Sequence, residues 1–431
     1  MNDPVVVIGA GLAGMAAAAR LAKAGHTVEL WEQSAHLGGA WAPYPLAGSS
    51  VLVDDAPVVL NFPAPWRDLF RKSGRPMEAE LTRAGYQLVP AAPTRITFAD
   101  GSELDLPTDR GEQFAAMSQA YGGTVAGRWR DLLDRLDDAW QTLRPLGLER
   151  ELDPARLTPD VRHRLLHRRS VADLAASLAH PQLSSLVRSV AYRQGSTPER
   201  TPASAAVDLS VARTFGAWHL APSRPGPGFD TGRSSVLVEA LAARLQVRKV
   251  VVRTETAVTG LVVRGGRVVA VRHAGGEQPA AAVVATVDPR VLAGLRPRSS
   301  VRDRWRLRGL RPAPAPAVTH QVDAEPAETV SETVVLSADG VPVVHYRRPA
   351  GDLAVTSVHD FGRPAPGPGH GLAARGFRGW WQRPPISDET SSLYTAGPCS
   401  PAGRQPSLQI LSGALASYAC HDQLSGGVGQ N

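Results

Sequence analysis

The chain opens with a short apolar run, a glycine-rich turn, a longer apolar stretch and a second short apolar run, in the sequence VVVIGAGLAGMAAAARLAKAGHTVELWE. This pattern predicts a buried strand at Val5–Ile8, a helix at Met15–Ala24 and a second strand at Thr27–Trp31. Alanine occupies four successive positions, 16–19, and these small side chains let the helix lie close on a sheet. We therefore predict a βαβ unit over residues 4–32.

Helical patterning dominates the next part of the chain, between about Arg67 and His219. Its clearest segments are RWRDLLDRLDDAWQTL and SVADLAASLAHPQLSSLVRSV. In the second segment, Ser170 is suited to cap the helix and Asp173 stands at the third helical position. After a Pro/Gly-rich loop, RSSVLVEALAARL predicts one more helix.

Short strands return after that helix. The segment KVVVRTETAVTGLVVRGGRVVAVRHAGG contains Gly265-Gly266, a pair typical of a hairpin turn, and AAVVATVDP predicts a buried strand. A proline-rich stretch follows, and SSLYTAGPCSPAGRQPSLQILSGALASYACHD predicts a strand, a glycine-rich loop and a helix.

Segments typical of a nucleotide-binding fold therefore occur at the start, in the middle and at the end of the chain. A length of 431 residues suits two domains. We predict an α/β protein in which a Rossmann-like cofactor domain is built from discontinuous segments and a mixed α+β substrate domain is inserted between them. The cofactor segments are 1–75, 230–290 and 390–431, and the substrate segments are 76–229 and 291–389.

Composition narrows the class of protein. The chain is 43% hydrophobic and 20% charged, as is ordinary for a globular protein, and no apolar run approaches the ~18 residues that span a bilayer. The N-terminal sequence lacks the basic region of a secretory signal. Cys399 and Cys420 form neither a disulfide framework nor a metal motif. We expect reduced thiols, no metal site and a cytoplasmic location.

The net charge of +7 comes mainly from scattered arginines, since only three residues are lysine. Nucleic-acid binding needs a clustered basic face with interleaved aromatic residues, so we expect no nucleic-acid partner. The two basic runs, Arg162–Arg169 and Arg302–Arg311, are typical of solvated faces. The second contains Trp305 and Leu307, and an alternative is peripheral contact with an anionic membrane, at the inner membrane face.

The first glycine turn carries the clearest chemistry. Gly9, Gly11 and Gly14 match GxGxxG between a strand and a helix, which is the context of a dinucleotide-binding turn. The helix N-terminus supplies N–H groups to a phosphate. Glu32, at the end of the second strand, is placed to accept hydrogen bonds from a ribose diol and would repel the 2′-phosphate of NADP.

A second glycine pair, Gly38-Gly39, follows within EQSAHLGGAW. NAD-only dehydrogenases do not require it, whereas an extended dinucleotide needs a second close approach of the backbone to its diphosphate. This pair favours FAD as the cofactor.

With these features the chain resembles the phytoene-desaturase-like FAD oxidoreductases of the flavin amine oxidoreductase superfamily. Further similar segments are DDAPVVLNFPAPWRDLFRKSGRP, AVTGLVVRGGRVVAVRHAGGE, VVATVDP and LYTAGPCSPAGRQPSLQILSGALASYA. The resemblance covers residues 1–75, 230–290 and 390–425 well and the two inserted stretches poorly. It is specific for fold and cofactor, and unspecific for substrate.

The resemblance implies a set of cofactor contacts. The first glycine turn and the second would hold the diphosphate, Glu32 the adenosine ribose and Val258 the adenine. Asp55–Pro57 would run beside the isoalloxazine, and the helix that begins at Ser407 would point its N-terminus at the flavin, where its dipole stabilises negative charge. The candidate cofactor-binding residues are Gly9, Gly11, Leu12, Ala13, Gly14, Glu32, Gln33, Gly38, Gly39, Ala40, Trp41, Asp55, Ala56, Pro57, Val258, Gly397, Pro398, Ser407, Leu408 and Gln409.

Four departures from the family pattern affect this comparison. Ala40 stands where the family usually has arginine, and Ala56 where glycine is common beside the flavin. The loop SPAGRQPS is less glycine-rich than in phytoene desaturases, and the 290–389 stretch is shorter. These departures weaken the prediction of a carotenoid desaturase more than that of a flavoenzyme.

The implied reaction is hydride removal from a C–H bond of a small apolar substrate, of isoprenoid or polyene type, and it needs no side-chain nucleophile. The catalytic residues, the identity of the substrate, the electron acceptor (oxygen, quinone or protein) and the oligomeric state stay open. The choice among desaturation, oxidation and isomerisation stays open as well. The alternatives are an amine oxidase of the same fold, a non-catalytic FAD-binding partner protein and an NAD-only dehydrogenase. The secondary candidates for the pocket are His219, Trp218, Trp380-Trp381 and Cys399. Packing roles are favoured for these residues, and the alternative for the tryptophan pair is that it roofs the pocket.

Overall fold

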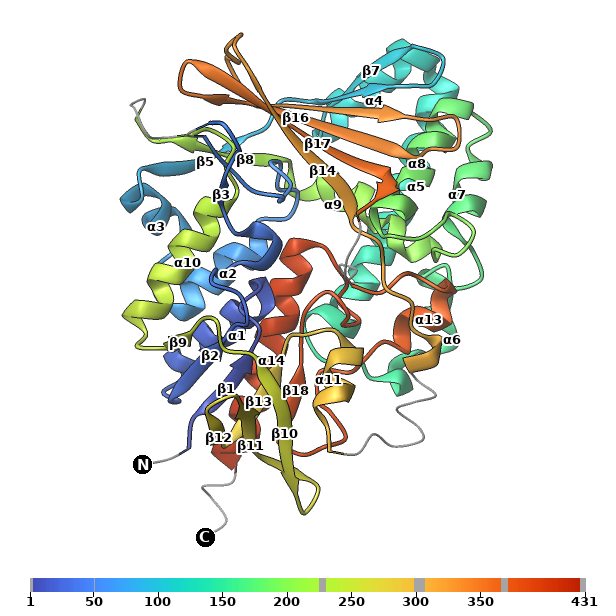
Figure 1. Cartoon of the computed structure of the whole chain (residues 1–431). Coiled ribbons are helices and arrows are strands. Elements are labelled where there is room, and N and C mark those ends of the chain that lie inside the picture. Colours follow the sequence, from blue (N-terminus) through green and yellow to red (C-terminus); the bar gives the residue numbers. More distant parts are fainter. Residues whose placement is uncertain (1–2, 50, 225–229, 298–306, 366–370, 427–431) are drawn as a thin grey trace.

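A computed structural model describes residues 3–49, 51–224, 230–297, 307–365 and 371–426. Two layered units are visible, with a parallel sheet in the lower part of Figure 1 and a mixed sheet in the upper part. The ends of the described chain lie near one another beside the parallel sheet (Figure 1).

The parallel sheet has five strands in the order β18-β13-β1-β2-β9. The strands come from the start, the middle and the end of the sequence, so the sheet is assembled from discontinuous segments. Their bounds are β1 Val5–Ile8, β2 Val28–Trp31, β9 Val251–Arg253, β13 Ala282–Ala285 and β18 Leu393–Thr395.

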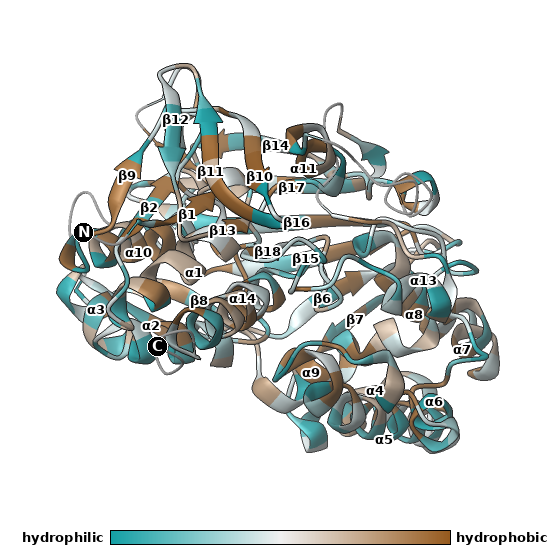
Figure 2. Ribbon diagram, turned by 90° about the horizontal axis from the view of Figure 1, so that it is seen from below, coloured by the Kyte–Doolittle hydropathy of each residue, from teal (hydrophilic) through white to brown (hydrophobic). Residues whose placement is uncertain are grey.

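Successive side chains of β1 point to opposite faces of this sheet, and different elements cover the two faces. Val5 and Val7 are buried against helices, whereas Val6 and Ile8 are buried against an antiparallel meander. Figure 2 shows the hydrophobic residues along the parallel strands and the elements packed on them. The helices are α1 Leu12–Lys23, α2 Ala64–Ser73, α10 Ser235–Val247 and α14 Pro406–Gly426, and the meander is β10 Val258–Arg264, β11 Arg267–His273 and β12 Gly276–Pro279.

Most local predictions for this unit are confirmed, with shifted ends. Helix α1 begins at Leu12, three residues before the predicted start, because Gly11 is its N-cap and Gly14 already lies inside the helix. The Gly265-Gly266 turn joins β10 to β11 as predicted. The capping box of Ser170 and Asp173 is present at the start of helix α7, in the other unit.

The mixed sheet has six strands in the order β14-β17-β16-β15-β6-β7. Its pairs are antiparallel except β15 with β6, which join residues more than 200 positions apart, such as Thr333 and Arg95. The bounds are β6 Thr94–Thr97, β7 Glu103–Leu106, β14 Pro316–Asp323, β15 Ser331–Leu336, β16 Pro342–Ala350 and β17 Leu353–Pro364.

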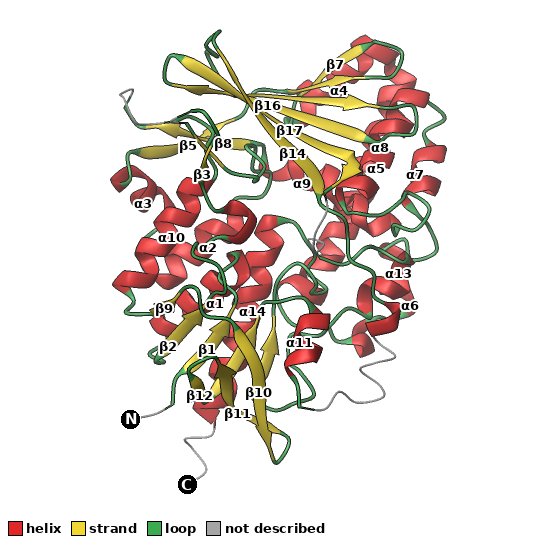
Figure 3. Cartoon of the chain, in the orientation of Figure 1, coloured by secondary structure: helices red, strands yellow, loops and turns green. Residues whose placement is uncertain are grey.

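Helices pack against one face of the mixed sheet (Figure 3). They include α4 Arg110–Tyr121, α5 Gly123–Leu143, α7 Val171–Ser177, α8 Pro181–Arg193 and α9 Val207–Phe215. The prediction of a mainly helical stretch over 67–219 was incomplete, since β5 Tyr86–Pro90, β6 and β7 lie within it. The stretch also includes the first two residues of β8 Trp218–Pro222, which pairs with β5. Smaller elements are α3 Met77–Arg83, α6 Pro159–Arg164, α11 Pro289–Leu295, α13 Gly376–Trp381, β3 Tyr44–Pro45 and β4 Leu52–Val53.

The predicted fold class is confirmed: a Rossmann-like parallel sheet from discontinuous strands is combined with a mixed-sheet unit. Among the described residues, no helix combines the length and the apolar character needed to cross a bilayer. Much of the basic run Arg302–Arg311, residues 302–306, lies outside the described residues.

Candidate dinucleotide and substrate site

The first glycine turn lies at the carboxyl end of β1. The Gly9 N–H donates to the Trp31 carbonyl oxygen (2.8 Å), and Gly9 has φ +96°. A Cβ on Gly14 would lie 1.9 Å from the Gly9 carbonyl oxygen, so only glycine fits there. By contrast, a Cβ on Gly11 would meet nothing within 4 Å. Two of the glycines therefore shape the turn, and Gly11 leaves open space beside it.

Two further glycine turns meet the first. The Gly38 N–H donates to the Ala10 carbonyl oxygen (2.8 Å), and a Cβ on Gly39 would lie 3.7 Å from the Gly11 Cα. A Cβ on Gly397, after β18, would lie 4.0 Å from the Ala13 Cβ. Helix α1 starts between these turns with no side chain capping its first turn. Unpaired N–H groups at such a helix end favour an anion.

Glu32 is held beside the first glycine turn by three hydrogen bonds. Its carboxylate accepts from the Ala10 N–H (2.8 Å), the Ser34 N–H (2.9 Å) and the Ser34 hydroxyl (2.9 Å). These contacts fix a carboxylate at the end of β2, next to the start of α1, where the sequence predicts a contact with the ribose.

A cavity of about 710 Å³ begins at these turns and extends below the mixed sheet. This volume is within the range of small-molecule and cofactor sites. Thirteen of the predicted residues line the cavity, and they come from four separate segments: Gly11, Leu12, Ala13, Gly38, Gly39, Ala40, Trp41, Asp55, Pro57, Gly397, Pro398, Ser407 and Gln409. The other seven lie outside its lining: Gly9, Gly14, Glu32, Gln33, Ala56, Val258 and Leu408.

The segment with Asp55 and Pro57 is anchored by its buried neighbour Asp54. The Asp54 carboxylate accepts from the Ser235 N–H at the start of α10 (2.9 Å), and the Ser234 hydroxyl donates to the Pro57 carbonyl oxygen (2.7 Å). Burial raises the pKa of Asp54, while the hydrogen bonds from Ser235 act in the opposite direction. Helix α10 thus fixes the position of Asp55 at the cavity.

Asp55 belongs to a hydrogen-bonded cluster that the sequence did not indicate. The Tyr44 hydroxyl donates to Asp55 Oδ1 (2.7 Å), and His320 Nε2 lies 3.3 Å from the same oxygen. His320 Nδ1 lies 2.8 Å from Ser357 Oγ. Although burial opposes it, hydrogen bonds from His320 and Tyr44 hold the pKa of Asp55 below its usual value. The cluster keeps a carboxylate ionised at the cavity wall.

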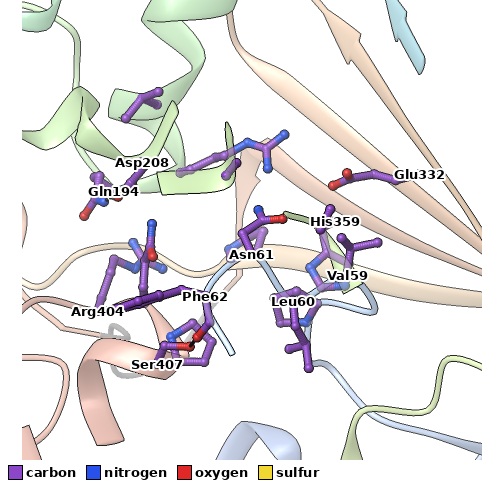
Figure 4. A pocket seen from close by; sticks show the side chains of 18 of the residues that line it. Val59, Leu60, Asn61, Phe62, Gln194, Asp208, Glu332, His359, Arg404 and Ser407 are labelled. Carbon is purple, nitrogen blue, oxygen red and sulfur yellow. Dashed lines mark hydrogen bonds between the residues drawn. The ribbon is translucent and has the colours of Figure 1, made fainter. Parts of the chain in front are cut away.

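The inner chamber of the cavity, below the mixed sheet, has polar groups on opposite walls (Figure 4). Glu332 and His359 come from the sheet, and Asp208 and Gln194 from the helical side. Gln194 Nε2 donates to Asp208 Oδ2 (2.8 Å), and burial raises the Asp208 pKa to about 6. No local signal in the sequence indicated these residues, because they lie in the inserted stretches.

The secondary candidates do not line this cavity. His219 is buried with Nδ1 3.1 Å from the Leu220 carbonyl oxygen, and the Trp218 indole donates to Phe215. Trp380 donates to the Pro401 carbonyl oxygen, and Trp381 lines a separate cavity, so the pair does not roof the main cavity. Cys399 is buried, and burial raises its pKa to about 12, as expected of a packing residue. No cluster of metal ligands occurs among the described residues.

Comparison with known proteins agrees with this geometry. Residues 7–73 match the family model of the NAD(P)-binding Rossmann-like domain. The chain is 31% identical over 292 residues to a phytoene dehydrogenase of Streptomyces griseus, a match that covers 66% of this chain and 54% of that protein. It is 37% identical over 139 residues to a hydroxyneurosporene desaturase of Cereibacter sphaeroides, covering 32% of this chain and 27% of that protein.

The chain therefore spans about half or less of the length of these curated relatives. Among solved structures, the cyclohexylamine oxidase of Brevibacterium oxydans superposes with a TM-score of 0.63 at 14% identity, over 100% of both chains. At that identity the likeness is one of fold. The whole chain, and not only its N-terminal unit, thus has the architecture of this fold group.

Proposed function

We propose that this chain, a Rossmann-type dinucleotide-binding protein related to the phytoene desaturases, is an FAD-dependent oxidoreductase that removes a hydride from an isoprenoid or polyene substrate. One observation carries the proposal. Three glycine turns from distant segments converge at the N-terminus of α1, and the cavity that starts there continues into a chamber below the mixed sheet. A dinucleotide and a second molecule can meet within one such cavity.

The residues present fit FAD better than a shorter NAD site. The Gly38-Gly39 turn contacts the first turn at Gly11, which supports a diphosphate held from two sides. Ser407 and Gln409, near the N-terminus of the 21-residue helix α14, line the cavity further along. The positive end of this helix dipole suits a ring system that gains negative charge on reduction. The first-turn N–H groups of α1 also offer a phosphate contact where the family arginine is replaced by Ala40.

Within this proposal, Asp55 would lie beside the flavin and the inner chamber would hold the substrate. FAD, when bound, supplies a hydride acceptor, and the organic chemistry is that of the cofactor. The chain's own residues orient the reactants and hold the proton that the substrate loses. Asp208 is the carboxylate suited to that second role, because a carboxyl with a pKa of about 6 exchanges protons near neutral pH.

Anaerobic bleaching of the flavin tests the proposed reaction. The holoprotein is mixed without oxygen with phytoene in detergent micelles, and in parallel with putrescine. We expect absorbance at about 450 nm to fall with the polyene and to stay constant with the amine. Bleaching by putrescine alone would favour an amine oxidase, and bleaching by neither compound would contradict this choice of substrate.

A further inference from the structure

One arginine in the inner chamber has no partner in the described part of the chain. Arg193 is the last residue of α8 and lines the cavity, yet it forms no hydrogen bond or ion pair with any described residue. Its positive charge acts to lower the pKa values of Asp208, Tyr346 and His359. These three residues line the cavity from α9, β16 and β17. The guanidinium therefore lies between the helical wall and the sheet.

The carboxylates of the chamber are satisfied by neutral donors and do not need this arginine. Asp208 accepts from Gln194 (2.8 Å) and also from Gln405, while Glu332 accepts from the Thr94 hydroxyl (2.7 Å) and from Tyr346. Arg193 is half-buried, and its guanidinium has five N–H donors that no described residue uses. The chamber thus has unused donors with a positive charge.

A second polar group, on the sheet side of the chamber, is also unpartnered. His359 is 4% exposed, and its Nε2 is buried without a hydrogen-bond partner. Its ring meets the Tyr346 ring edge-on, with 5.2 Å between the centroids. Buried polar atoms are normally hydrogen-bonded, so one left open beside a cavity points to a polar ligand.

Apolar residues supply much of the remaining wall, including Ile96, Val334 and Phe361 from the sheet and Leu186 and Val190 from α8. A ligand that matches both parts has an apolar body and one acidic end. The nearby carboxylates of Asp208 and Glu332 disfavour a multiply charged end such as a diphosphate.

We propose that Arg193 binds a carboxylate at one end of an otherwise apolar substrate, and that His359 lines the same subsite. This inference rests on the proposed function, because it places the apolar remainder of the substrate toward the dinucleotide. Among isoprenoid substrates, it favours those that carry a terminal carboxylate over neutral compounds of the same length.

Calorimetric titration of the holoprotein with three matched C10 probes tests the inference: geranate, geraniol and geranyl diphosphate. A charge-assisted hydrogen bond makes geranate bind at least about tenfold more tightly than geraniol. Arg193→Gln should reduce this preference to less than about threefold and leave the affinity for geraniol unchanged, whereas Arg193→Lys should retain part of it.

The matched control is Arg188→Gln. Arg188 lies on the same helix, but it is held by the Asp339 carbonyl oxygen (3.1 Å) and by Glu199 (3.2 Å) and does not line the cavity. We expect this variant to keep the full preference of the wild-type protein. A preference lost equally in Arg188→Gln would overturn the role of Arg193.

Equal affinity of the wild-type protein for geranate and geraniol would also overturn the inference, without the need for any variant. Tighter binding of geranyl diphosphate than of geranate would overturn the choice of a carboxylate. Calorimetry does not use the flavin as its signal, and flavin content is measured separately by absorbance. Failure of the proposed cofactor is therefore distinguishable from failure of this subsite.

Discussion

At the scale of single residues, the glycines of the first turn have different tasks. A side chain on Gly14 would collide with the Gly9 backbone, whereas Gly11 faces open space and has φ −72°, which any residue adopts. Two polar residues of the chamber also stand out: the Nε2 atom of His359 is buried without a partner, and the half-buried Arg193 has no partner among the described residues. Each of these differences predicts a measurable difference between two protein variants.

The pair Gly14→Ala and Gly11→Ala separates folding from cofactor binding. Gly14→Ala should lower the free energy of unfolding of the apoprotein by about 1–3 kcal/mol, because the backbone must shift. Gly11→Ala should leave that free energy nearly unchanged and weaken FAD binding at least about tenfold, since its methyl group occupies the space of the diphosphate. Urea unfolding and FAD titration measure the two effects. Unchanged FAD affinity in Gly11→Ala would contradict the assigned cradle.

We expect the burial of His359 to make the folded protein less stable in mild acid. Burial, and then the charge of His320, lower the pKa of His359 to about 4, whereas an unfolded histidine has a pKa of about 6.5. Between these values the unfolded state binds a proton that the folded state does not, so stability falls as the pH falls through this window. At pH 5 this contribution is about 2 kcal/mol at most.

The test compares urea unfolding at pH 7 and pH 5. His359→Gln should lose about 2 kcal/mol less than the wild-type protein between the two conditions. His163→Gln, which removes an exposed imidazole of α6, is the control and should follow the wild-type protein. Identical pH dependence of His359→Gln and the wild-type protein would show that the buried imidazole does not oppose protonation.

At the scale of elements, the close contact of α1 and α14 holds the start and the end of the chain together. A Cβ on Gly413 of α14 would lie 2.3 Å from the Ala13 carbonyl oxygen. The alanine-rich face of α1 is buried in the same core. Because α1 and α14 both present N-terminal residues to the cavity, their spacing also sets the geometry of the candidate site.

Two glycine-to-alanine changes within helices should have opposite signs. Gly413→Ala should lower the free energy of unfolding by about 1–3 kcal/mol through the clash with α1. Gly127→Ala, on α5, meets nothing within 4 Å and should raise it by about 0.5–1 kcal/mol, since alanine favours the helix. Thermal or urea unfolding of both variants measures this. Stabilisation by Gly413→Ala would mean that the two helices are not in close contact.

The elements of the parallel sheet were predictable, and those of the mixed sheet were not. Apolar runs beside glycine turns, as at Val5–Ile8, give a strong local signal. The buried face of β16 includes Arg348, and that of β17 includes Ser357 and His359, so polar residues interrupt the usual apolar alternation. These polar positions, of which His359 lines the chamber, weaken the local sequence signal for both strands.

At the scale of the whole molecule, the candidate site is assembled from segments that no local pattern connects. The glycine turns were predictable because each has its own motif. The chamber was not, since it depends on the pairing of β6 with β15 and on residues such as Asp208 and Glu332 that lie 124 positions apart. The sequence thus supports a prediction of the cofactor, whereas the nature of the substrate depends on the assembled fold.

If the converging glycine turns bind FAD, the protein has the absorption spectrum of a bound flavin. The purified protein is incubated with FAD, passed over a desalting column and scanned before and after dithionite. We predict a retained band at about 450 nm that dithionite bleaches, at close to one flavin per chain. A folded protein, verified by circular dichroism, that retains no flavin would contradict the account.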